Sequence, residues 1–271
     1  MADAVRYRTM TTEELRETFL VSDLFEAAKV TLTYVDLDRT VIGSAVPSAG
    51  PLRLPTDDAL KAEYFTERRE LGILNIGGAG KVTVSGLQYD LERLDALYVG
   101  RGNEEVIFSS TDPGKPAEFY LLSYPAHAQH ATQVVRSAGV ERVKLGAATT
   151  ANAREITKLI HLQGVQSCQL VMGFTQLASG SVWNTMPPHT HMRRSEVYLY
   201  FDIAEAERVV HMMGPAKETR HLVVANKQAV VSPGWSIHAG VGTTNYTFCW
   251  GMGGENQVYN DMDALAISDL E

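Results

Sequence analysis

The segment PPHTHMRRSE contains the residues whose types and spacing point most directly to chemistry. His189 and His191 are two residues apart, and on a β-strand this spacing places both imidazoles on one face. Glu196 follows at a point where a tight turn through Arg193 to Ser195 would bring the next strand alongside. A carboxylate there can face the same pocket as the two imidazoles, so the segment predicts three ligands for a metal ion.

A fourth candidate ligand lies downstream in VVSPGWSIHAG, where Pro233 and Gly234 predict a turn ahead of His238. Three imidazoles and one carboxylate make a mixed nitrogen and oxygen site that suits Zn, Fe, Mn, Ni or Cu. An open coordination position on such an ion would polarise a substrate carbonyl as a Lewis acid. The sequence therefore predicts one metal site, formed by His189, His191, Glu196 and His238.

An H-x-H pair by itself is more often two solvated or hydrogen-bonded histidines than a metal site. The glutamate at this spacing, the β-strand setting and the downstream P-G-x-x-x-H element together favour the metal site over that alternative. The remaining histidines lie in loosely patterned stretches or beside strands, where we expect solvated or packed side chains: His127, His130, His161, His211 and His221.

Arg193 and Arg194 lie between the predicted metal ligands in the sequence, so at least one of them could point toward an anionic substrate. A guanidinium binds a carboxylate through two parallel hydrogen bonds, which a lysine ammonium does not match. The alternative is an ion pair with the acidic surface of the protein, and the sequence leaves both interpretations open for each arginine.

The elements that would position these residues are β-strands. Short apolar segments recur at a spacing of about 8–12 residues, as in barrels and sandwiches; they include LGILNIGG, KVTVSG, DALYVG, EVYLYFDI, QAVVSP and YTFCWGMGG. Strands do not alternate with long helices, which argues against a parallel sheet. A short helix is expected within residues 12–28, with Glu14 placed for a capping box. Residues 149–162 could form a helix or an extended connector.

The bulk composition restricts the class of protein. The chain has 271 residues, and its hydrophobic fraction of 45% and charged fraction of 21% are ordinary for a globular protein. A net charge of −8 without a run of lysines or arginines argues against binding to nucleic acid or anionic lipid. We expect no membrane helix and no secretory signal, and we expect Cys168 and Cys249 to be buried free thiols. These features favour the cytoplasm.

A weak internal repeat predicts two similar all-β lobes. FTERRELGILNI can be laid against HTHMRRSEVYLYF so that Arg68-Arg69 falls on Arg193-Arg194, and DALYVGRG then falls on QAVVSPGW. We expect one lobe in residues 1–127 and a second, metal-binding lobe in residues 128–271.

Several longer strings resemble the 5-keto-4-deoxyuronate isomerase family, also called 4-deoxy-L-threo-5-hexosulose-uronate ketol-isomerases. In the second half they are VWNTMPPHTHMRRSEVYLYFD, AVVSPGWSIHAGVGT and YTFCWGMGGENQVYNDMD. In the first half they are FLVSDLF, ELGILNIGGAGKVTV and DALYVGRGNEEVIF, so the resemblance covers nearly the whole chain. It implies a two-lobed cupin, that is, a double jelly-roll of β-barrels, with a few short helices.

The resemblance implies an enzyme, an intramolecular oxidoreductase of the aldose–ketose type. Its reaction would convert 5-dehydro-4-deoxy-D-glucuronate to 3-deoxy-D-glycero-2,5-hexodiulosonate in pectin breakdown, and the family implies zinc and a cytoplasmic homohexamer. The first lobe has Tyr64, Thr66 and Leu71 where ligands would fall, so we expect one divalent metal ion per chain. One departure is that the second element reads P-G-x-x-x-H rather than the general cupin pattern P-x-G-x-x-H.

Such an isomerisation needs an electrophile at the carbonyl oxygen and a base near the carbon-bound proton. We expect the metal to hold the substrate's carbonyl and hydroxyl oxygens, and Arg193 or Arg194 to hold its carboxylate. The candidates for the base are Glu218, Glu255, Asp261 and Tyr259, with Glu255 favoured because it begins the polar triplet Glu255-Asn256-Gln257. The alternatives are a cupin oxygenase that uses Fe(II) and a non-catalytic sugar-binding cupin.

Overall fold

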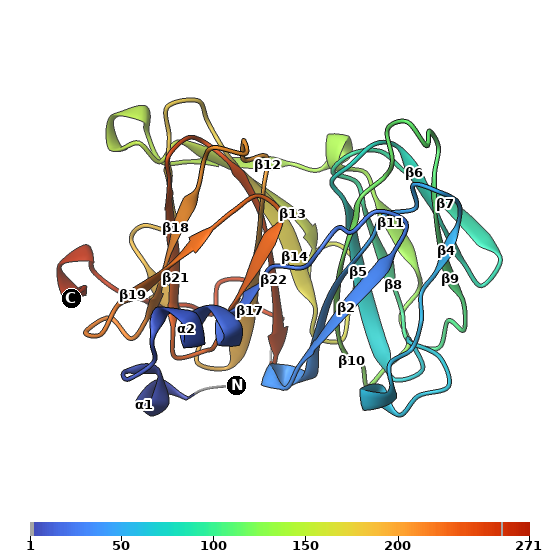
Figure 1. The fold of residues 1–271 in the computed structure, drawn as a ribbon, viewed down its shortest axis with the longest axis horizontal. Helices are drawn as coiled ribbons and strands as arrows, with labels where there is room; N and C mark the ends of the chain where they lie inside the picture. The colour runs from blue at the N-terminus through green and yellow to red at the C-terminus, as the bar shows by residue number, and fades with distance from the viewer. Residues whose placement is uncertain (1–2, 256) are drawn as a thin grey trace. The chain divides into compact units, whose positions relative to one another are not determined.

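β-Strands form the framework of this chain. The computed structural model describes residues 3–255 and 257–271. Within these ranges, α-helix is confined to α1 (Ala4–Tyr7) and α2 (Thr12–Phe19), and Figure 1 shows the strands that make up the rest of the framework. The all-β prediction is confirmed.

The chain divides into two compact units, each of which is discontinuous in sequence. Unit 1 comprises residues 1–22, 141–158 and 173–271, and unit 2 comprises residues 23–140 and 159–172. The expected lobes, 1–127 and 128–271, differ from these units in three places: the first 22 residues belong with unit 1, and residues 128–140 and 159–172 belong with unit 2. The strands β13 (Arg154–Ile160) and β14 (Val171–Leu177) each contribute residues to both units.

A buried carboxylate explains why residues 168–170 belong with unit 2. Glu70 is fully buried, and it accepts hydrogen bonds from the backbone N–H groups of Cys168, Gln169 and Leu170 at 2.6, 2.8 and 2.8 Å. The Tyr98 hydroxyl donates a fourth at 2.7 Å. A buried carboxylate is stable only with such partners. Hydrogen bonds to Glu70 therefore hold residues 168–170 in unit 2, and no local sequence pattern predicts them.

Unit 2 consists of two sheets around an apolar core. Their strand orders are β11-β8-β5-β10-β3-β2 and β4-β9-β6-β7. The core contains Ile73, Leu97, Phe108 and Phe119, and the two phenylalanine rings lie 5.4 Å apart. The strands are β2 (Val30–Val35), β3 (Thr40–Ala45), β4 (Leu52–Arg53), β5 (Arg69–Asn75), β6 (Gly80–Val84), β7 (Leu87–Leu91), β8 (Ala96–Val99), β9 (Val106–Ser110), β10 (Phe119–Pro125) and β11 (Gln133–Val135).

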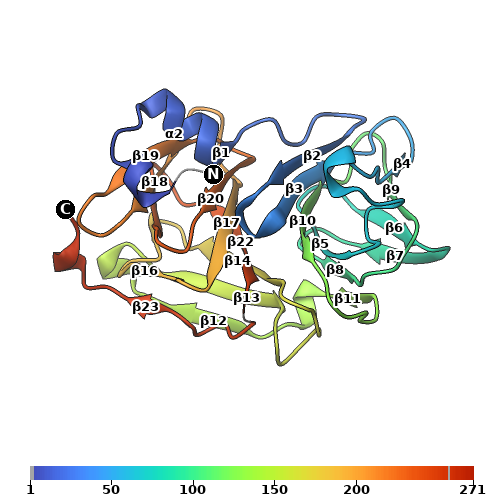
Figure 2. The ribbon, with the colours of Figure 1, turned by 90° about the horizontal axis from the view of Figure 1, so that it is seen from below.

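Unit 1 repeats this plan with a larger sheet, of order β1-β20-β17-β22-β14-β13-β12, and a smaller one, of order β15-β21-β18-β19. The short strands β16 and β23 pair separately, and β23 runs along the same side of the unit as β12 (Figure 2). Besides β13 and β14, the strands are β1 (Leu20–Val21), β12 (Arg142–Leu145), β15 (Trp183–Asn184), β16 (His189–Thr190), β17 (Arg194–Phe201), β18 (Val209–Gly214), β19 (Arg220–Val224), β20 (Gln228–Ser232), β21 (Ile237–Gly242), β22 (Thr247–Gly254) and β23 (Asp263–Ala264).

The internal repeat seen in the sequence is present in the strand register. With Arg69 laid on Arg194, the position of Leu71 corresponds to that of Glu196. Leu71 of β5 pairs with Val99 of β8, and Glu196 of β17 pairs with Ser232 of β20. The second stretch of the repeat, DALYVGRG over QAVVSPGW, predicts the same correspondence of Val99 with Ser232. The two units therefore share one strand-pairing scheme.

The prediction of a short helix near the N-terminus is confirmed. Thr11 and Glu14 form the capping box that begins α2 at Thr12, and the helix ends at Phe19, within the expected range of residues 12–28. The ring of Phe19 lies 6.3 Å from that of Trp235, and α2 contacts β19 and β20. Short 3-10 turns occur at Leu37–Arg39, Asp58–Leu60, Ser137–Gly139, Ala148–Thr150 and Ile267–Asp269.

Two further expectations can be compared with the structure. Residues 154–160 are extended, in β13, which decides the question that the sequence left open for residues 149–162. Both cysteines are buried and free, as expected. In the part of the chain that is described, no helix has the length and apolar character needed to cross a bilayer.

Candidate metal centre and adjoining cavity

Three separate pieces of unit 1 supply the four predicted ligands. His189 lies in β16, which pairs with β23 through His189 and Ala264, and His191 follows two residues later. Glu196 lies in β17, between β20 and β22. His238 lies in β21, opposite Met213 of β18. Because β17 is flanked on both sides by hydrogen-bonded strands, the backbone of the carboxylate ligand is held firmly.

Two glycines allow the ligand-bearing turn to lie against its neighbours. A Cβ atom at Gly234 would lie 2.6 Å from the carbonyl oxygen of His191, and one at Gly254 would lie 2.6 Å from that of Arg193. Gly254 also has a φ of +146°, a conformation that side chains disfavour. The close approach of the His191 backbone therefore requires a glycine at position 234, within the P-G-x-x-x-H element.

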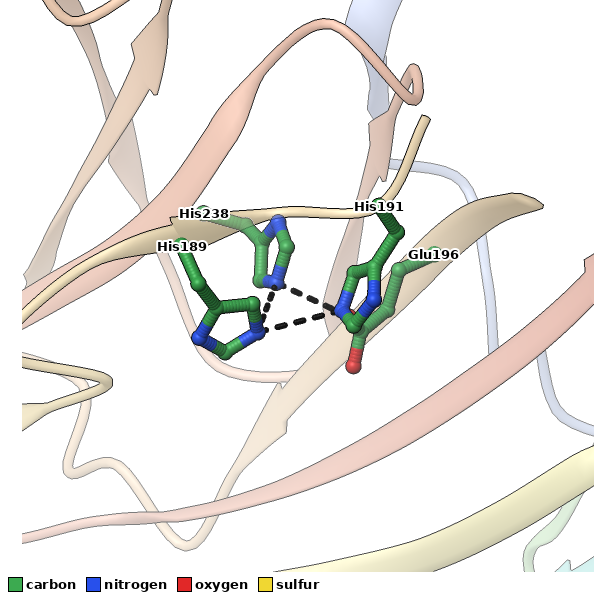
Figure 3. Close-up of side chains that lie close together, drawn as sticks. All are labelled: His189, His191, Glu196 and His238. Carbon is green, nitrogen blue, oxygen red and sulfur yellow. Dashed lines mark hydrogen bonds and ion pairs between the residues drawn. The ribbon is translucent and has the colours of Figure 1, made fainter. Parts of the chain in front are cut away.

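The four side chains converge on one centre (Figure 3). The Nε2 atom of His189 lies 3.1 Å from Nε2 of His191 and 3.0 Å from Nε2 of His238. Oε2 of Glu196 lies 3.0 Å from Nε2 of His191 and 2.9 Å from Nε2 of His238. All four donor atoms lie within 4.8 Å of one another. The structure thus brings together every residue that the sequence predicted as a ligand.

The site is buried, and burial shapes its protonation. Desolvation, followed by the electrostatic interaction with the adjacent His238 imidazole, lowers the pKa of His189 to about 3, so this imidazole is neutral at physiological pH. Burial alone would raise the pKa of Glu196, but its interactions with the neighbouring imidazoles of His238 and His191 outweigh burial and hold that pKa well below its usual range. A neutral imidazole and an ionised carboxylate are the forms that bind a cation.

The second nitrogen of two imidazoles has a hydrogen-bond acceptor. Nδ1 of His191 lies 3.0 Å from the carbonyl oxygen of Asp261, and Nδ1 of His238 lies 3.3 Å from the Ser232 hydroxyl. A proton on Nδ1 leaves Nε2 free as a ligand, which is the usual arrangement around a protein-bound metal. Arg194 also approaches Nδ1 of His191, at 3.1 and 3.2 Å. Since a guanidinium can only donate, the metal-binding tautomer makes its hydrogen bond to Asp261 instead.

The donor set fits one divalent ion. Metal–ligand distances of about 2.0–2.2 Å place neighbouring donors roughly 3.0–3.5 Å apart in tetrahedral or octahedral geometry, close to the separations found here. Oε2 of Glu196 is buried and has no N–H directed at it with hydrogen-bond geometry, although two Nε2 atoms lie within 3.0 Å. Lone pairs that face one another in this way are stabilised by a shared cation.

A cavity of about 350 Å³ opens onto this centre within unit 1. Its walls include the ligands His189, His191 and Glu196; the other lining residues include Arg154, Lys158, Tyr198 and Tyr259. Tyr198 donates to or accepts from the Thr185 hydroxyl at 3.0 Å. The cavity is large enough for a six-carbon sugar acid, since small-molecule pockets typically begin at about 300 Å³.

Arg194 is placed away from the substrate role that the sequence suggested. Its side chain is 3% exposed, and its guanidinium donates to the backbone carbonyl oxygens of Val258, Tyr259 and Asp261. These carbonyls belong to the segment that carries Tyr259 into the cavity wall. Arg194 therefore positions this wall and is not among the residues that line the cavity.

Arg193 and Glu255 lie at the surface. Their side chains are 59% and 75% exposed, and Arg193 Nε lies 3.5 Å from Glu255 Oε2. Neither belongs to the described lining of the cavity, and Asn256, the middle of the predicted triplet, lies outside the described residues. Of the candidates for the base, Tyr259 lines the cavity, whereas Glu218 and Asp261 do not belong to that lining.

Sequence reasoning missed Arg154 and Lys158. Both lie in β13 and line the cavity. The segment REITKLI carries both residues, but its pattern admitted a helix as well as a strand, so it did not show which side chains share a face.

The chain matches known proteins over nearly its full length. The model of the KduI/IolB family matches residues 20–267. A 4-deoxy-L-threo-5-hexosulose-uronate ketol-isomerase from Formosa agariphila is 54% identical over 96% of this chain and 92% of its own length. One of the same name from Shouchella clausii is 52% identical over 98% of this chain and 96% of its own length. The family resemblance predicted from the sequence is confirmed.

Solved structures match the fold at low sequence identity. An IolB-like protein from Salmonella typhimurium superposes with a TM-score of 0.72 at 12% identity, covering 91% of this chain and 96% of that one. An oxalate decarboxylase superposes with a TM-score of 0.62 at 10% identity, covering 91% and 79%. Together with the paired β-sheets of each unit, these matches confirm the predicted all-β, cupin-like fold.

Proposed function

Because the chain belongs to the KduI/IolB family, we propose that it is a ketol-isomerase that acts on 4-deoxy-L-threo-5-hexosulose-uronate, with a divalent metal ion held by His189, His191, Glu196 and His238. Relatives that are about half identical over nearly the whole chain carry the name of this isomerase. The observation that carries the metal-dependent part is the convergence of three imidazole nitrogens and one carboxylate oxygen within 4.8 Å.

The proposed reaction moves a proton between two neighbouring carbons of the substrate, converting an aldehyde and adjacent hydroxyl into a hydroxyl and adjacent ketone. A divalent ion at this centre would act as a Lewis acid toward a substrate carbonyl or hydroxyl oxygen. We propose zinc as this ion, one per chain, because the donor set is nitrogen-rich and the family resemblance points to it.

The chain's own side chains supply positioning and hydrogen bonds. Burial raises the pKa of Tyr259 to about 12, so its hydroxyl keeps its proton at neutral pH. Tyr259 therefore enters the proposal as a hydrogen-bond donor to a substrate oxygen rather than as the base. The Tyr198 hydroxyl, whose pKa burial likewise raises, is held by Thr185 and can donate in the same way.

The proposal is tested by a metal analysis paired with an assay on the keto-deoxyuronate. Purified protein is expected to contain close to one equivalent of zinc per chain and to form the 2,5-diketo product under anaerobic conditions. Dialysis against a chelator should abolish turnover, and added zinc should restore it. Full turnover in protein shown to be free of metal would contradict the metal role. Dependence on Fe(II) and dioxygen would instead identify an oxygenase.

The family resemblance also supports a homohexamer, a cytoplasmic location and a role in pectin breakdown, and we include these in the proposal. Sedimentation of the purified chain measures the first directly. A hexamer would sediment as six chains of 29.7 kDa, clearly separated from a dimer or a monomer.

A further inference from the structure

One strand of unit 1 presents two positive charges to the cavity that contains the metal centre. In β13, Arg154, Ile156 and Lys158 line the cavity, as expected for alternate residues of a strand. The intervening Glu155 faces the other way and lies 3.6 Å from Lys144 of β12, in an ion pair. The register of these two strands, with Lys144 opposite Glu155, fixes which charges face the cavity.

Neither cavity-facing cation has an acidic partner. In residues 3–255 and 257–271, no carboxylate oxygen lies within 4.0 Å of the Arg154 guanidinium or the Lys158 ammonium. Arg154 donates to the backbone carbonyl of Asn152 at 2.8 Å. Lys158 Nζ lies 4.0 Å from the centre of the Tyr259 ring, which is a cation–π contact. Both side chains are half-buried, so these charges are partly removed from water without an ion pair.

This arrangement is unusual for a protein with an excess of acidic residues. The chain carries a net charge of −8, yet the described lining of the cavity contains two cations and a single carboxylate, that of Glu196. Glu196 is directed at three imidazoles rather than at Arg154 or Lys158. A metal ion at the centre would make the cavity more positive still, and a cavity of this charge attracts an anion.

The two arginines nearer to the metal ligands in sequence are not placed to bind an anion in the cavity. The Arg194 guanidinium donates its hydrogen bonds to three backbone carbonyls, and Arg193 is exposed beside Glu255. The two cations of β13 are thus the charged donors on the cavity wall, in the part of the chain that is described, that could bind an acid group.

We propose that Arg154 and Lys158 form the subsite for the substrate's carboxylate, with Arg154 as its main hydrogen-bonding partner and Lys158 as a second charge beside Tyr259. The inference rests on the proposed function, because it assumes a uronate in this cavity. A guanidinium offers paired donors to a carboxylate, and an anchor at this end leaves the aldehyde end of the substrate for the metal centre. The subsite would make the enzyme select sugar acids over neutral sugars.

The test uses the full-length, metal-loaded protein and the variants Arg154→Met and Lys158→Met. Each is expected to raise KM for the keto-deoxyuronate by about 10- to 100-fold, since a charged hydrogen bond is lost, with a smaller change in kcat. Lys144→Met is the matched control: it lies on the neighbouring strand and faces away from the cavity, so its KM should equal that of the wild type. Arg154→Lys should recover part of the affinity.

A binding measurement separates failure of this inference from failure of the proposed function. Titration calorimetry requires no turnover and compares two ligands. D-Gluconate is a six-carbon carboxylate without an aldehyde or ketone, and D-glucitol is its neutral counterpart. Gluconate affinity should fall in both β13 variants and stay constant in Lys144→Met, and glucitol affinity should be equal in all. The same KM and gluconate affinity in Arg154→Met and Lys158→Met as in the wild type would overturn the subsite while leaving the isomerase standing.

Two other outcomes are also decisive. If the wild type does not turn over the keto-deoxyuronate, the proposed function fails, and loss of gluconate binding in the variants still supports the anion subsite. If gluconate does not bind the wild type, and KM is unchanged in the variants, the subsite is refuted. Equal melting temperatures and metal contents of wild type and Lys158→Met, whose side chain is half-buried, show that the effect is not one of folding.

Discussion

A strand that begins with a buried arginine occurs twice in this protein, as β5 in unit 2 and as β17 in unit 1. Two residues after the arginine, β5 has Leu71 and β17 has Glu196, and both pair with the corresponding positions of the neighbouring strands, Val99 and Ser232. Leu71 is fully buried in the apolar core of its unit, whereas Glu196 faces three imidazoles. The same strand framework therefore supports either a packed core or a metal centre, and a few side chains decide which.

The buried arginine has the same structural role in both units: it donates hydrogen bonds to backbone carbonyls of another segment. Arg69 is 6% exposed and donates to the carbonyl oxygens of Arg39 and Ser123 at 2.6 and 2.8 Å. Arg194 is 3% exposed and donates to backbone carbonyls of residues 258–261. A residue that appeared to belong to the chemistry, because it lies among the ligands in sequence, is a part of the framework that holds a neighbouring segment.

The largest expected difference between the units follows from replacing a ligand. Glu196→Gln keeps the shape of the side chain but removes the charge that balances a divalent ion, so we expect metal content to fall and kcat/KM to drop by at least about 100-fold. The matched control is Tyr64→Phe, at the position in unit 2 that corresponds to His189. Metal analysis and steady-state assays of both variants measure the contrast.

Tyr64→Phe should retain full metal and full activity if the centre of unit 1 is the metal site. A Glu196→Gln protein that keeps one tightly bound ion and wild-type turnover would show that the contrast between the units has no catalytic meaning.

An intermediate effect is expected from the two buried arginines. Arg194→Met leaves the carbonyls of residues 258–261 without their donor, so the wall that carries Tyr259 should loosen and kcat/KM should fall by roughly 10-fold. We expect both substitutions to lower the free energy of unfolding by about 2 kcal/mol. Arg69→Met should nevertheless leave turnover unchanged. Hydrogen exchange at residues 258–263, together with kinetics and urea denaturation, distinguishes the two.

Equal losses of activity in Arg69→Met and Arg194→Met would argue that both arginines act only through global stability. Unchanged exchange at residues 258–263 in Arg194→Met would argue against its role in holding the cavity wall.

The smallest expected effect is on the stability of the protein at acidic pH. Burial, followed by the charge of His238, lowers the pKa of His211 to about 3, compared with about 6.5 in an unfolded chain. The unfolded state then binds the proton more readily, so this residue makes the free energy of unfolding fall as pH decreases from about 6.5 toward 3. Between pH 6.5 and 5.5 the loss should be about 1 kcal/mol.

His211→Gln removes this contribution and retains an acceptor for the Tyr200 hydroxyl, which lies 2.7 Å from Nδ1 of His211. Urea denaturation of the metal-free proteins at several pH values should show the wild type losing stability relative to the variant as the solution becomes more acidic. A difference that is constant with pH would contradict a depressed pKa at His211.

Much of the fold and the ligand set could be predicted because both depend on local patterns. Short apolar segments at regular spacing predicted the strands, and His189, His191 and Glu196 lie close enough in sequence for their strand and turn geometry to be inferred. His238 was accessible because a proline and a glycine mark the turn before it. The need for glycine at position 234 could not be predicted, because it arises from the contact of Gly234 with the His191 carbonyl oxygen.

The residues of the cavity wall could not be predicted, because their positions depend on long-range contacts or on a residue spacing that fits both a helix and a strand. Arg154 and Lys158 are four residues apart, a spacing that puts two side chains on one face of either a helix or a strand, so the sequence could not say which residues accompany them. The partners of Arg194 lie more than sixty residues away, beyond any local pattern. Glu255 was favoured for its polar neighbours, but composition does not tell a cavity wall from an exposed turn.

The connection between β12 and β13 has a consequence for the sign of the cavity's charge. A slip of β13 by one residue would turn Glu155 inward and Arg154 and Lys158 outward, exchanging two cations for an anion. The intervening turn resists this, since a Cβ at Gly146 would lie 2.2 Å from the carbonyl oxygen of Asn152 and the Asn152 side chain accepts from the Ala147 backbone at 3.0 Å. Insertions or deletions of a single residue between Leu145 and Arg154 should therefore be far less tolerated than substitutions there, because they would replace the two cations of the cavity wall with a carboxylate.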